Sequence, residues 1–285
     1  MGYHCPDRVE DALAALAGGA SVIAGGTDWY PALGDAPAPG DVLDITRLPG
    51  FRGITRAGAG GGDGDGAGWR IGAATTWTEL ARAGLPGCFA GLAAAAREVG
   101  GLQIQNAGTI GGNLCNASPA ADGVPPLLTL DATVRLVSGV GARDLALADF
   151  ITGPRRTALA PGELLESLYI PDPGAAGAGF VKLGARKYLV ISIAMVAALV
   201  KVEGGAITAA RVAVGACAPV ACRLPALEAA LAGRTAARLA DAVLPDHLAP
   251  LAPISDVRGS AAYRLDVVPD LIRRALAQAM GRADG

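Results

Sequence analysis

A run of small residues divides this sequence into two parts of different character. Gly174 to Gly179 contains only glycine and alanine and follows Ile170-Pro171-Asp172-Pro173, a pattern typical of a boundary between folding units. The chain has 285 residues, more than the ~100–200 of a usual single domain, so we expect two or three such units. We predict three, comprising residues 1–54, 55–173 and 174–285.

The first two parts combine helices and strands. Asp7-Arg8-Val9-Glu10 predicts a capping box for a helix that ends at Ala17, and strands are predicted over residues 21–24 and 41–45. A second capping box is predicted at Thr76-Trp77-Thr78-Glu79, a strand over 69–73 and a helix over 88–99.

Glycine and aspartate dominate residues 58–68, and we interpret this segment as a hairpin tip. It contains Gly62-x-Gly64-x-x-Ala67, which has the form of a dinucleotide-binding fingerprint. That motif needs a strand before it and a helix after it, whereas here a strand follows. We therefore do not assign a Rossmann fold.

The third part reads as an α+β layer. Strands are predicted over residues 179–183, 188–202 and 206–217, and Glu203-Gly204-Gly205 joins the last two as a hairpin turn. Helices are predicted over 225–231 and over 269–280, where Pro269 stands at the helix start.

Composition excludes several classes of protein. The 24 basic and 26 acidic residues give a net charge of −2, which offers no electrostatic reason to expect nucleic acid as a partner. The longest apolar run, Tyr188 to Val200, is shorter than the ~20 residues of a membrane helix, and the N-terminus has no signal-peptide pattern. We expect a cytoplasmic protein without membrane insertion.

Metal and nucleophile chemistry are also disfavoured. The five cysteines form no C-x-x-C pair, and only two histidines are present. This pattern matches neither an iron–sulfur nor a zinc site. We therefore predict free thiols, no metal site and no catalytic residues in this chain.

Two glycine-rich segments stand apart from the rest of the sequence. Each places paired glycines beside Thr, Asn or Asp, and such glycines let backbone N–H groups converge on an anion such as a diphosphate. Tight turns are the alternative for the glycines, and helix capping or an Asx turn for Asp28 and Asp122. The segments are Ile23-Ala24-Gly25-Gly26-Thr27-Asp28-Trp29 and Gly108-Thr109-Ile110-Gly111-Gly112-Asn113, continuing to Asp122.

Both segments and their spacing resemble the FAD-binding, or medium, subunit of the molybdenum hydroxylases, the xanthine dehydrogenase and carbon monoxide dehydrogenase family. Its members carry an A-G-G-T-D-like loop and, about eighty residues later, T-I-G-G-N-x-x-x-A-S-P-x-x-D. Three further segments resemble the family's E-x-L-x-x-I-x-I-P, F-x-K-x-x-x-R and D-x-R-x-S-x-x-Y-R patterns. They begin at Glu163, Phe180 and Asp256.

The resemblance implies an α+β fold, in which an FAD-binding domain of the vanillyl-alcohol-oxidase (PCMH) type, built from two α/β subdomains, precedes an α+β C-terminal domain. It implies that the two glycine segments hold the FAD diphosphate and ribityl chain, and that Asp122, Leu165 and Lys182 lie near the cofactor. Lys182 is apt there because a positive charge stabilises the anionic reduced flavin. Without the resemblance, Lys182 could equally be a strand lysine with its head in solvent.

The resemblance also implies a multi-subunit enzyme. A large subunit would carry the molybdenum cofactor and a small subunit two [2Fe–2S] clusters, and this chain would pass the electrons to NAD, oxygen or another carrier. A dimer of heterotrimers is expected. The alternative is a self-contained FAD oxidase or dehydrogenase that acts directly on a small molecule. Where some relatives place acidic or aromatic residues, this chain has Lys187-Tyr188-Leu189-Val190-Ile191-Ser192, so we expect an aliphatic side chain over the flavin.

Overall fold

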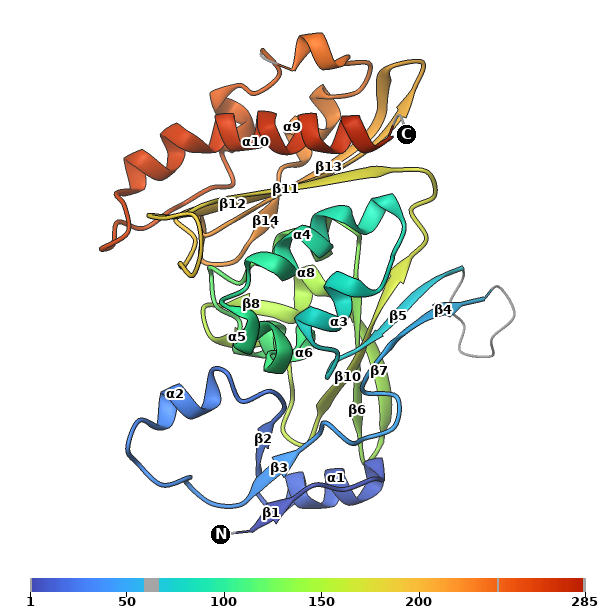
Figure 1. The fold of residues 1–285 in the computed structure, drawn as a ribbon, viewed down its shortest axis with the longest axis vertical. Coiled ribbons are helices and arrows are strands. Elements are labelled where there is room, and N and C mark those ends of the chain that lie inside the picture. Colours follow the sequence, from blue (N-terminus) through green and yellow to red (C-terminus); the bar gives the residue numbers. More distant parts are fainter. Residues whose placement is uncertain (1, 59–66, 240, 284–285) are drawn as a thin grey trace.

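The computed structural model describes residues 2–58, 67–239 and 241–283 and has three successive layers, with the N-terminal segment at one end and the C-terminal segment at the other (Figure 1). Most of the segment interpreted as a hairpin tip, residues 59–66, lies outside the described residues. Each of three larger sheets falls within one of the three predicted parts, apart from Ile54 at a boundary. The boundaries themselves stay predictions.

The N-terminal layer is a small parallel sheet with one covering helix. Its strands β1 (Tyr3–His4), β3 (Val42–Asp44) and β2 (Ser21–Ile23) lie in that order, and α1 (Val9–Ala17) packs against them through Ala12 and Leu43. A short helix, α2 (Trp29–Leu33), follows β2.

The capping box predicted at the start of α1 is wrong. The N-cap residue is Arg8, which makes no side-chain cap hydrogen bond. Asp7 therefore lies one residue too early to reach the free N–H groups of the first turn. Its carboxylate instead pairs with the Arg47 guanidinium at 3.0 Å.

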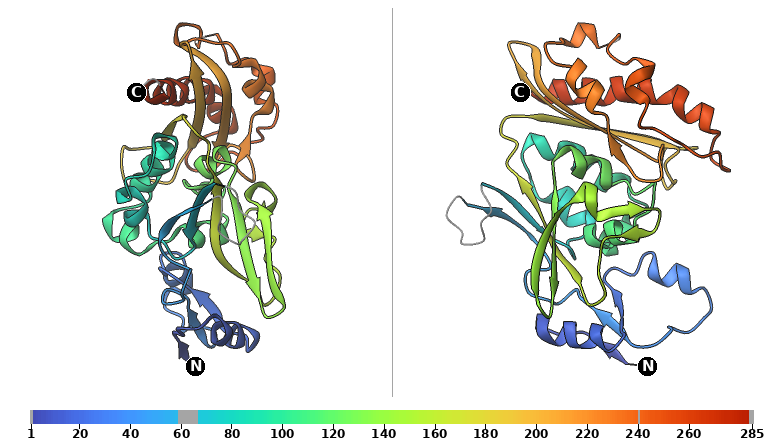
Figure 2. Two further views of the ribbon diagram at one scale, coloured as in Figure 1. Left: turned by 90° about the vertical axis from the view of Figure 1, so that its right-hand side faces the viewer. Right: turned by 180° about the vertical axis from the view of Figure 1, so that it is seen from behind.

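The middle layer contains a five-stranded antiparallel sheet in the order β4 (Ile54–Ala57), β5 (Gly68–Gly72), β10 (Leu164–Pro171), β6 (Thr133–Ser138) and β7 (Gly141–Ala146). The predicted strand over 69–73 is thus confirmed with a shift of one residue. Helices pack on this sheet in one large apolar core, and Figure 2 shows several of them gathered on one side of it.

The helices of this layer are α3 (Trp77–Arg82), α4 (Ala90–Glu98), α5 (Leu102–Ala107), α6 (Ile110–Asn116), α7 (Val124–Thr129) and α8 (Leu147–Phe150), with a 3₁₀ turn at Gly87–Phe89. A hairpin of β8 (Ile151–Gly153) and β9 (Arg156–Thr157) precedes β10. The capping box at Thr76 and Glu79 is confirmed. The helix predicted over 88–99 is also found, with its first residues in the 3₁₀ turn.

The C-terminal layer is an antiparallel sheet between two helices. Its order is β11 (Gly177–Leu183), β12 (Ala194–Glu203), β13 (Ala206–Gly215) and β14 (Cys222–Arg223). The long helix α10 (Ala261–Ala283) packs on one face and α4 on the other. Because both faces are covered, β12 is apolar almost throughout, and Gly204 and Gly205 form the predicted hairpin turn at φ +57° and +76°.

Short elements complete this layer: α9 (Pro225–Ala230) and 3₁₀ turns at Ala236–Arg238 and Pro245–Leu248. The helix predicted from Pro269 begins earlier, at Ala261, and Pro269 lies inside it. Proline costs helical stability in that position, but buried Arg264 and Val268 extend the face that packs on the sheet. Tertiary packing therefore overrides the local stop signal.

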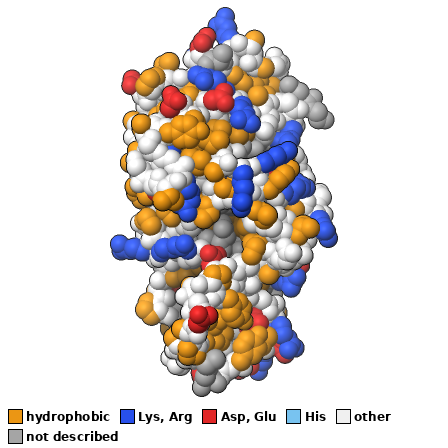
Figure 3. Space-filling model, turned by 60° about the vertical axis from the view of Figure 1, so that its left-hand side comes forward, with side chains coloured by type: hydrophobic (Ala, Val, Ile, Leu, Met, Phe, Trp, Pro, Cys, Tyr) orange, Lys and Arg blue, Asp and Glu red, His pale blue; other side chains and the backbone are white. Residues whose placement is uncertain are grey.

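The strand predicted over 188–202 also begins elsewhere, at Ala194. Leu189 has φ +53°, a left-handed conformation that a β-strand does not tolerate. Tyr188, Leu189 and Ile191 are more than half exposed, so they do not contribute to the core. On the face shown in Figure 3, basic side chains lie among hydrophobic ones. The basic side chains do not form one large charged patch there.

Candidate functional site

The main cavity lies where the three layers meet. Its volume is about 820 Å³, within the range of roughly 300–1,000 Å³ typical of ligand and cofactor sites. The wall is formed by the segment after β2, by α6 and the residues around it, by residues 155–165 and by Lys182 with the segment after β11. Residues from all three predicted parts are therefore needed to enclose it.

Almost all the predicted site residues line the cavity. They come from the two glycine segments and from the later positions Asp122, Leu165 and Lys182. Only Ile110 does not line it, because its side chain is buried in the core of the middle layer. The residues that line it are Ile23, Ala24, Gly25, Gly26, Thr27, Asp28, Trp29, Gly108, Thr109, Gly111, Gly112, Asn113, Asp122, Leu165 and Lys182.

The first glycine segment forms a tight turn with unused backbone donors. Gly26 has φ +68°, and a Cβ on Gly25 would lie 1.7 Å from the carbonyl oxygen of Ala107, so both positions require glycine. Among the described residues, no hydrogen bond uses the N–H groups of Gly25, Gly26 or Thr27. Consecutive free N–H groups beside a cavity suit an anion. Asp28 occupies the N-cap position of α2 but makes no side-chain cap bond.

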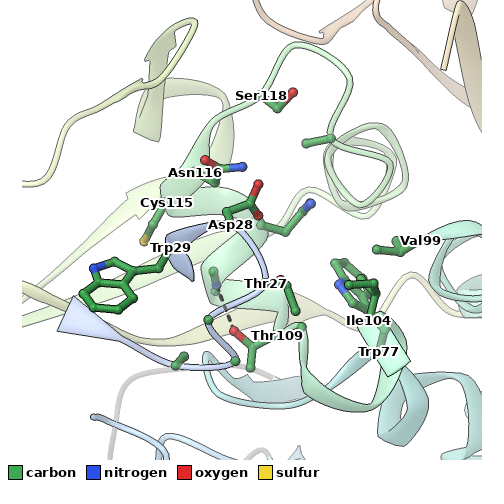
Figure 4. A pocket seen from close by; sticks show the side chains of 18 of the residues that line it. Thr27, Asp28, Trp29, Trp77, Val99, Ile104, Thr109, Cys115, Asn116 and Ser118 are labelled. Atoms are coloured by element: carbon green, nitrogen blue, oxygen red, sulfur yellow. Dashed lines mark hydrogen bonds between the residues drawn. The ribbon is translucent and has the colours of Figure 1, made fainter. Parts of the chain in front are cut away.

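The second segment does not present the converging free N–H groups that its paired glycines suggested. Gly111 and Gly112 lie in the first turn of α6, and neither has a positive φ. The N–H groups of Ile110 and Gly111 donate to the carbonyls of Thr75 and Ala73, at 2.9 and 2.8 Å. The N–H of Gly112 donates to Thr109 Oγ1 at 3.1 Å, drawn as a dashed line in Figure 4. These three donors are therefore already used within the chain.

The two glycines of α6 serve different purposes. A Cβ on Gly111 would lie 2.6 Å from the Cβ of Ala73 and 2.7 Å from its carbonyl oxygen, so Gly111 lets α6 pack against the scaffold. A Cβ on Gly112 would approach only Thr109 Oγ1, at 2.9 Å. Gly112 is exposed and lines the cavity. Only Gly112 therefore leaves room for a ligand.

Asn113 presents an unsatisfied acceptor beside the cavity. Its Oδ1 is buried and has no hydrogen-bond partner within the described part of the chain. Because a buried acceptor without a partner costs about 1–3 kcal/mol, a ligand hydroxyl or N–H at this position would be favourable. The free N–H groups of the first segment and this acceptor together fit the diphosphate and hydroxyl-bearing chain of a dinucleotide.

A buried ion pair closes another part of the wall. The Lys182 ammonium lies 2.6 Å from Asp122 Oδ2, and both side chains are more than 90% buried. Ser192 donates to Asp122 Oδ1 at 2.6 Å, and Lys182 also donates to the Glu98 carbonyl oxygen. Burial raises the pKa of the Asp122 carboxyl, and Lys182 and Ser192 oppose that effect. Lys182 is therefore neither the solvated strand lysine nor an unpaired positive charge.

Arg264 fixes the segment that carries Ser192. This arginine, in the first turns of α10, is 3% exposed and donates to the carbonyl oxygens of Ile193 and Ala216. Its Nη2 also pairs with Asp256 at 2.7 Å. The D-x-R-x-S-x-x-Y-R segment thus acts on the cavity only indirectly, by holding the residue next to Ser192.

Several residues of the wall were not among the predicted site residues. Figure 4 shows Trp77, Val99 and Ile104 on one side of the cavity, and Cys115 and Asn116 near Asp28 and Trp29 on another. Cys115 is an exposed free thiol. Asn116 and Ser118 stand inside the second motif and could have been found from it, whereas Trp77 and Arg155 carry no sequence signal.

Comparison with known proteins identifies this architecture. A family model described as "FAD binding domain in molybdopterin dehydrogenase" matches residues 1–173, and "CO dehydrogenase flavoprotein C-terminal domain" matches residues 180–279. The first match covers more than half of the chain. The chain belongs to the FAD-binding subunits of the molybdopterin dehydrogenases.

Individual relatives match this chain over almost their whole length. The putative xanthine dehydrogenase FAD-binding subunit XdhB of Escherichia coli (strain K12) is 32% identical over 298 residues, covering 99% of this chain and 97% of the relative. Quinoline 2-oxidoreductase from Pseudomonas putida 86 superposes with a TM-score of 0.88 at 26% identity, covering 99% of this chain and 98% of the other. Carbon monoxide dehydrogenase from Hydrogenophaga pseudoflava lacking the Mo-pyranopterin moiety of its molybdenum cofactor gives 0.85 at 30%, with the same coverage.

As a molybdopterin dehydrogenase FAD-binding subunit, the chain is a component of an oxidoreductase, and FAD is its cofactor. The prediction of an FAD-binding domain followed by an α+β C-terminal domain is confirmed. Within the described residues, no three His, Cys, Asp or Glu side chains are grouped to hold a metal ion. No described helix is both long and apolar enough to span a membrane.

Substitutions of the two glycines in α6 distinguish the packing role of Gly111 from the role of Gly112 in leaving the cavity open. Gly111→Ala is expected to lower the free energy of unfolding by about 1–3 kcal/mol, because its Cβ overlaps the backbone of Ala73. Gly112→Ala is expected to cost only about 1 kcal/mol, through the weakened Thr109 cap. Urea titration followed by circular dichroism measures both. A Gly111→Ala protein as stable as the wild type would contradict this assignment.

Proposed function

We propose that this subunit holds FAD non-covalently in the 820 Å³ cavity and relays electrons from [2Fe–2S] clusters to a terminal acceptor. The observation that carries the proposal is the convergence, on one cavity, of the free N–H groups of residues 25–27 and the unpaired Asn113 acceptor. These groups would bind the diphosphate and the hydroxyl-bearing chain. Leu165 and Lys182 would lie toward the ring. FAD supplies the redox chemistry, since a flavin exchanges electrons with one-electron and two-electron partners.

The chain's own residues position the cofactor and shield it. In the assembled enzyme, a large subunit with the molybdenum cofactor oxidises the substrate, and a small subunit carries the two clusters. We place this trimer in a cytoplasmic dimer of heterotrimers. The terminal acceptor is NAD, oxygen or another carrier. Leu189, Val190 and Ile191 line the cavity, which supports the expectation of an aliphatic cover over the flavin.

Among the described residues, no histidine supplies a base at the cavity for a self-contained oxidase. His4 contacts Asp41 in the N-terminal layer, and His247 accepts from the N–H of Leu244 in the C-terminal layer. Neither histidine lines the cavity. The relay therefore accounts better for the side chains that surround the cavity.

The state of the bound flavin tests the proposal. We expect the purified complex to contain one FAD per copy of this chain, and acid precipitation to release all of it to the supernatant. Cys115 lies in the wall as a free thiol, so the same test in a Cys115→Ser variant is the matched control. Flavin retained in the pellet of the wild type, or release of FMN, would contradict non-covalent FAD binding.

A further inference from the structure

A second, smaller cavity lies beside the edge strand of the C-terminal sheet. That strand is β11, and α4 and α10 both pack against it (Figure 1). The volume of the second cavity is about 430 Å³, within the range of roughly 300–1,000 Å³ typical of small-molecule sites. It shares Lys182 and Val190 with the main cavity but contains no residue of either glycine segment. It is therefore a separate site from the one proposed for FAD.

The wall of the second cavity carries an excess of positive charge. It contains one carboxylate, Glu98, and four basic side chains, those of Lys182, Arg186, Lys187 and Arg274. Lys182 is already neutralised by its carboxylate partner. None of the other three basic groups forms an ion pair within the described part of the chain. Three uncancelled positive charges and one negative charge leave a net charge of about +2, close to the charge of −1.5 to −2 that a phosphate monoester carries at pH 7.

The segment after β11 holds two of these cations at the cavity. Arg186 Nε donates to the carbonyl oxygens of Tyr188 and Leu189, at 3.0 and 3.1 Å. Because these acceptors carry no net charge, the guanidinium keeps its own charge. The Lys187 ammonium lies 5.2 Å from the centroid of the Tyr188 ring, a cation–π contact that likewise leaves its charge uncancelled.

The third cation and an apolar wall come from other elements. Arg274 projects from the exposed side of α10, so two separate parts of the chain direct positive charge at one cavity. Apolar side chains also line it, among them buried Phe180 of β11 and half-buried Ala94 of α4. A ligand that fits this wall combines an anionic group with an apolar one.

We propose that the second cavity binds a small phosphate monoester, whose phosphate is held by Arg186, Lys187 and Arg274 and whose organic group packs on the apolar side chains. A phosphate accepts several charge-assisted hydrogen bonds, and guanidinium groups match its geometry particularly well. This site goes beyond the proposed function, because nothing in it depends on FAD or on electron transfer.

Binding of phenyl phosphate to the assembled, FAD-loaded complex tests the proposal. We expect one equivalent to bind per copy of this chain in isothermal titration calorimetry at low salt. Lys187→Met and Arg274→Met should each weaken binding about tenfold, because each removes one charged donor from the phosphate. Inorganic phosphate should bind more weakly than phenyl phosphate, since it makes no use of the apolar wall. Arg186 is left unchanged, because its hydrogen bonds also hold the segment in place.

Arg273→Met is the matched control. It removes the same charge from the neighbouring position of α10, but Arg273 does not line the second cavity, so binding should stay within twofold of the wild type. Absence of binding to the complex would overturn the proposal. Binding to the isolated chain but not to the complex would do so as well, because another subunit would then fill the cavity. Binding that survives both Lys187→Met and Arg274→Met and is lost only when FAD is added would belong to the main cavity, and would overturn this proposal while leaving the proposed function intact.

Discussion

Turnover with the physiological acceptor is expected to disappear in a complex whose FAD-binding subunit carries Gly112→Val and Asn113→Ala. The valine side chain would project into the cavity from a position where glycine leaves it open, and the alanine removes a buried acceptor that FAD is proposed to satisfy. We expect FAD affinity to fall on the order of 100-fold, or about 2.8 kcal/mol. The complex should then be purified without flavin.

Loss of FAD should not stop the oxidation of the substrate. That step is proposed to occur at molybdenum in another subunit, so substrate should still bleach the iron–sulfur clusters. A dye that accepts electrons from the clusters should likewise still be reduced. Rapid-mixing absorbance spectroscopy measures the bleaching. Gly139→Val is the matched control, because a Cβ added to Gly139 would meet no described atom within 4 Å and this glycine does not line the cavity.

A different result would change the proposed function. If the flavin-free complex remained assembled and loaded with molybdenum but left its clusters oxidised, the substrate would have to be oxidised at FAD. The self-contained oxidase would then replace the relay.

Asp122→Ala is expected to destabilise the chain by about 3–5 kcal/mol, because it leaves the buried ammonium of Lys182 without its carboxylate partner. Ser192→Ala should cost less, since it removes one hydrogen bond of Asp122 and leaves the ion pair in place. Urea titration of the purified chain, followed by circular dichroism, measures the free energy of unfolding.

The double substitution Asp122→Ala with Lys182→Met tests whether the uncompensated charge of Lys182 causes this loss of stability. If the loss comes from the uncompensated charge, the double variant should recover much of it. A double variant less stable than Asp122→Ala alone would mean that packing of the Lys182 side chain, rather than its charge, dominates. An Asp122→Ala chain within about 1 kcal/mol of the wild type would contradict the importance of the pair.

The local sequence was sufficient to predict features that neighbouring residues form among themselves. The turn at Gly25 and Gly26, the Thr76 capping box and the hairpin at Gly204 and Gly205 each depend on residues adjacent in the chain. The resemblance to a known family then placed Asp122 and Lys182 in one site, and the structure brings them within 2.6 Å.

Features that depend on contacts between residues far apart in the chain could not be predicted from the sequence. Gly111 needs to be glycine because of Ala73, and its N–H is occupied by the Ala73 carbonyl, a partner far earlier in the chain. Arg155 lines the cavity, and its turn is bonded to Ala117, which is far earlier in the chain. The apolar run from Tyr188 suggested a strand, but residues 189–191 line the cavity instead of entering the sheet.

The cavity wall draws on residues from Val22 to Ile191, and Arg264 in α10 anchors the residue next to Ser192. During synthesis on the ribosome, the segment that matches the FAD-binding domain is complete by residue 173, well before Lys182, Ser192 and Arg264 have been added. A nascent chain at that stage has the two glycine segments but lacks the partner of Asp122. With FAD in this cavity, as proposed, we expect stable cofactor binding only after nearly the whole polypeptide has emerged, which would make flavin loading a late step in the biogenesis of the enzyme.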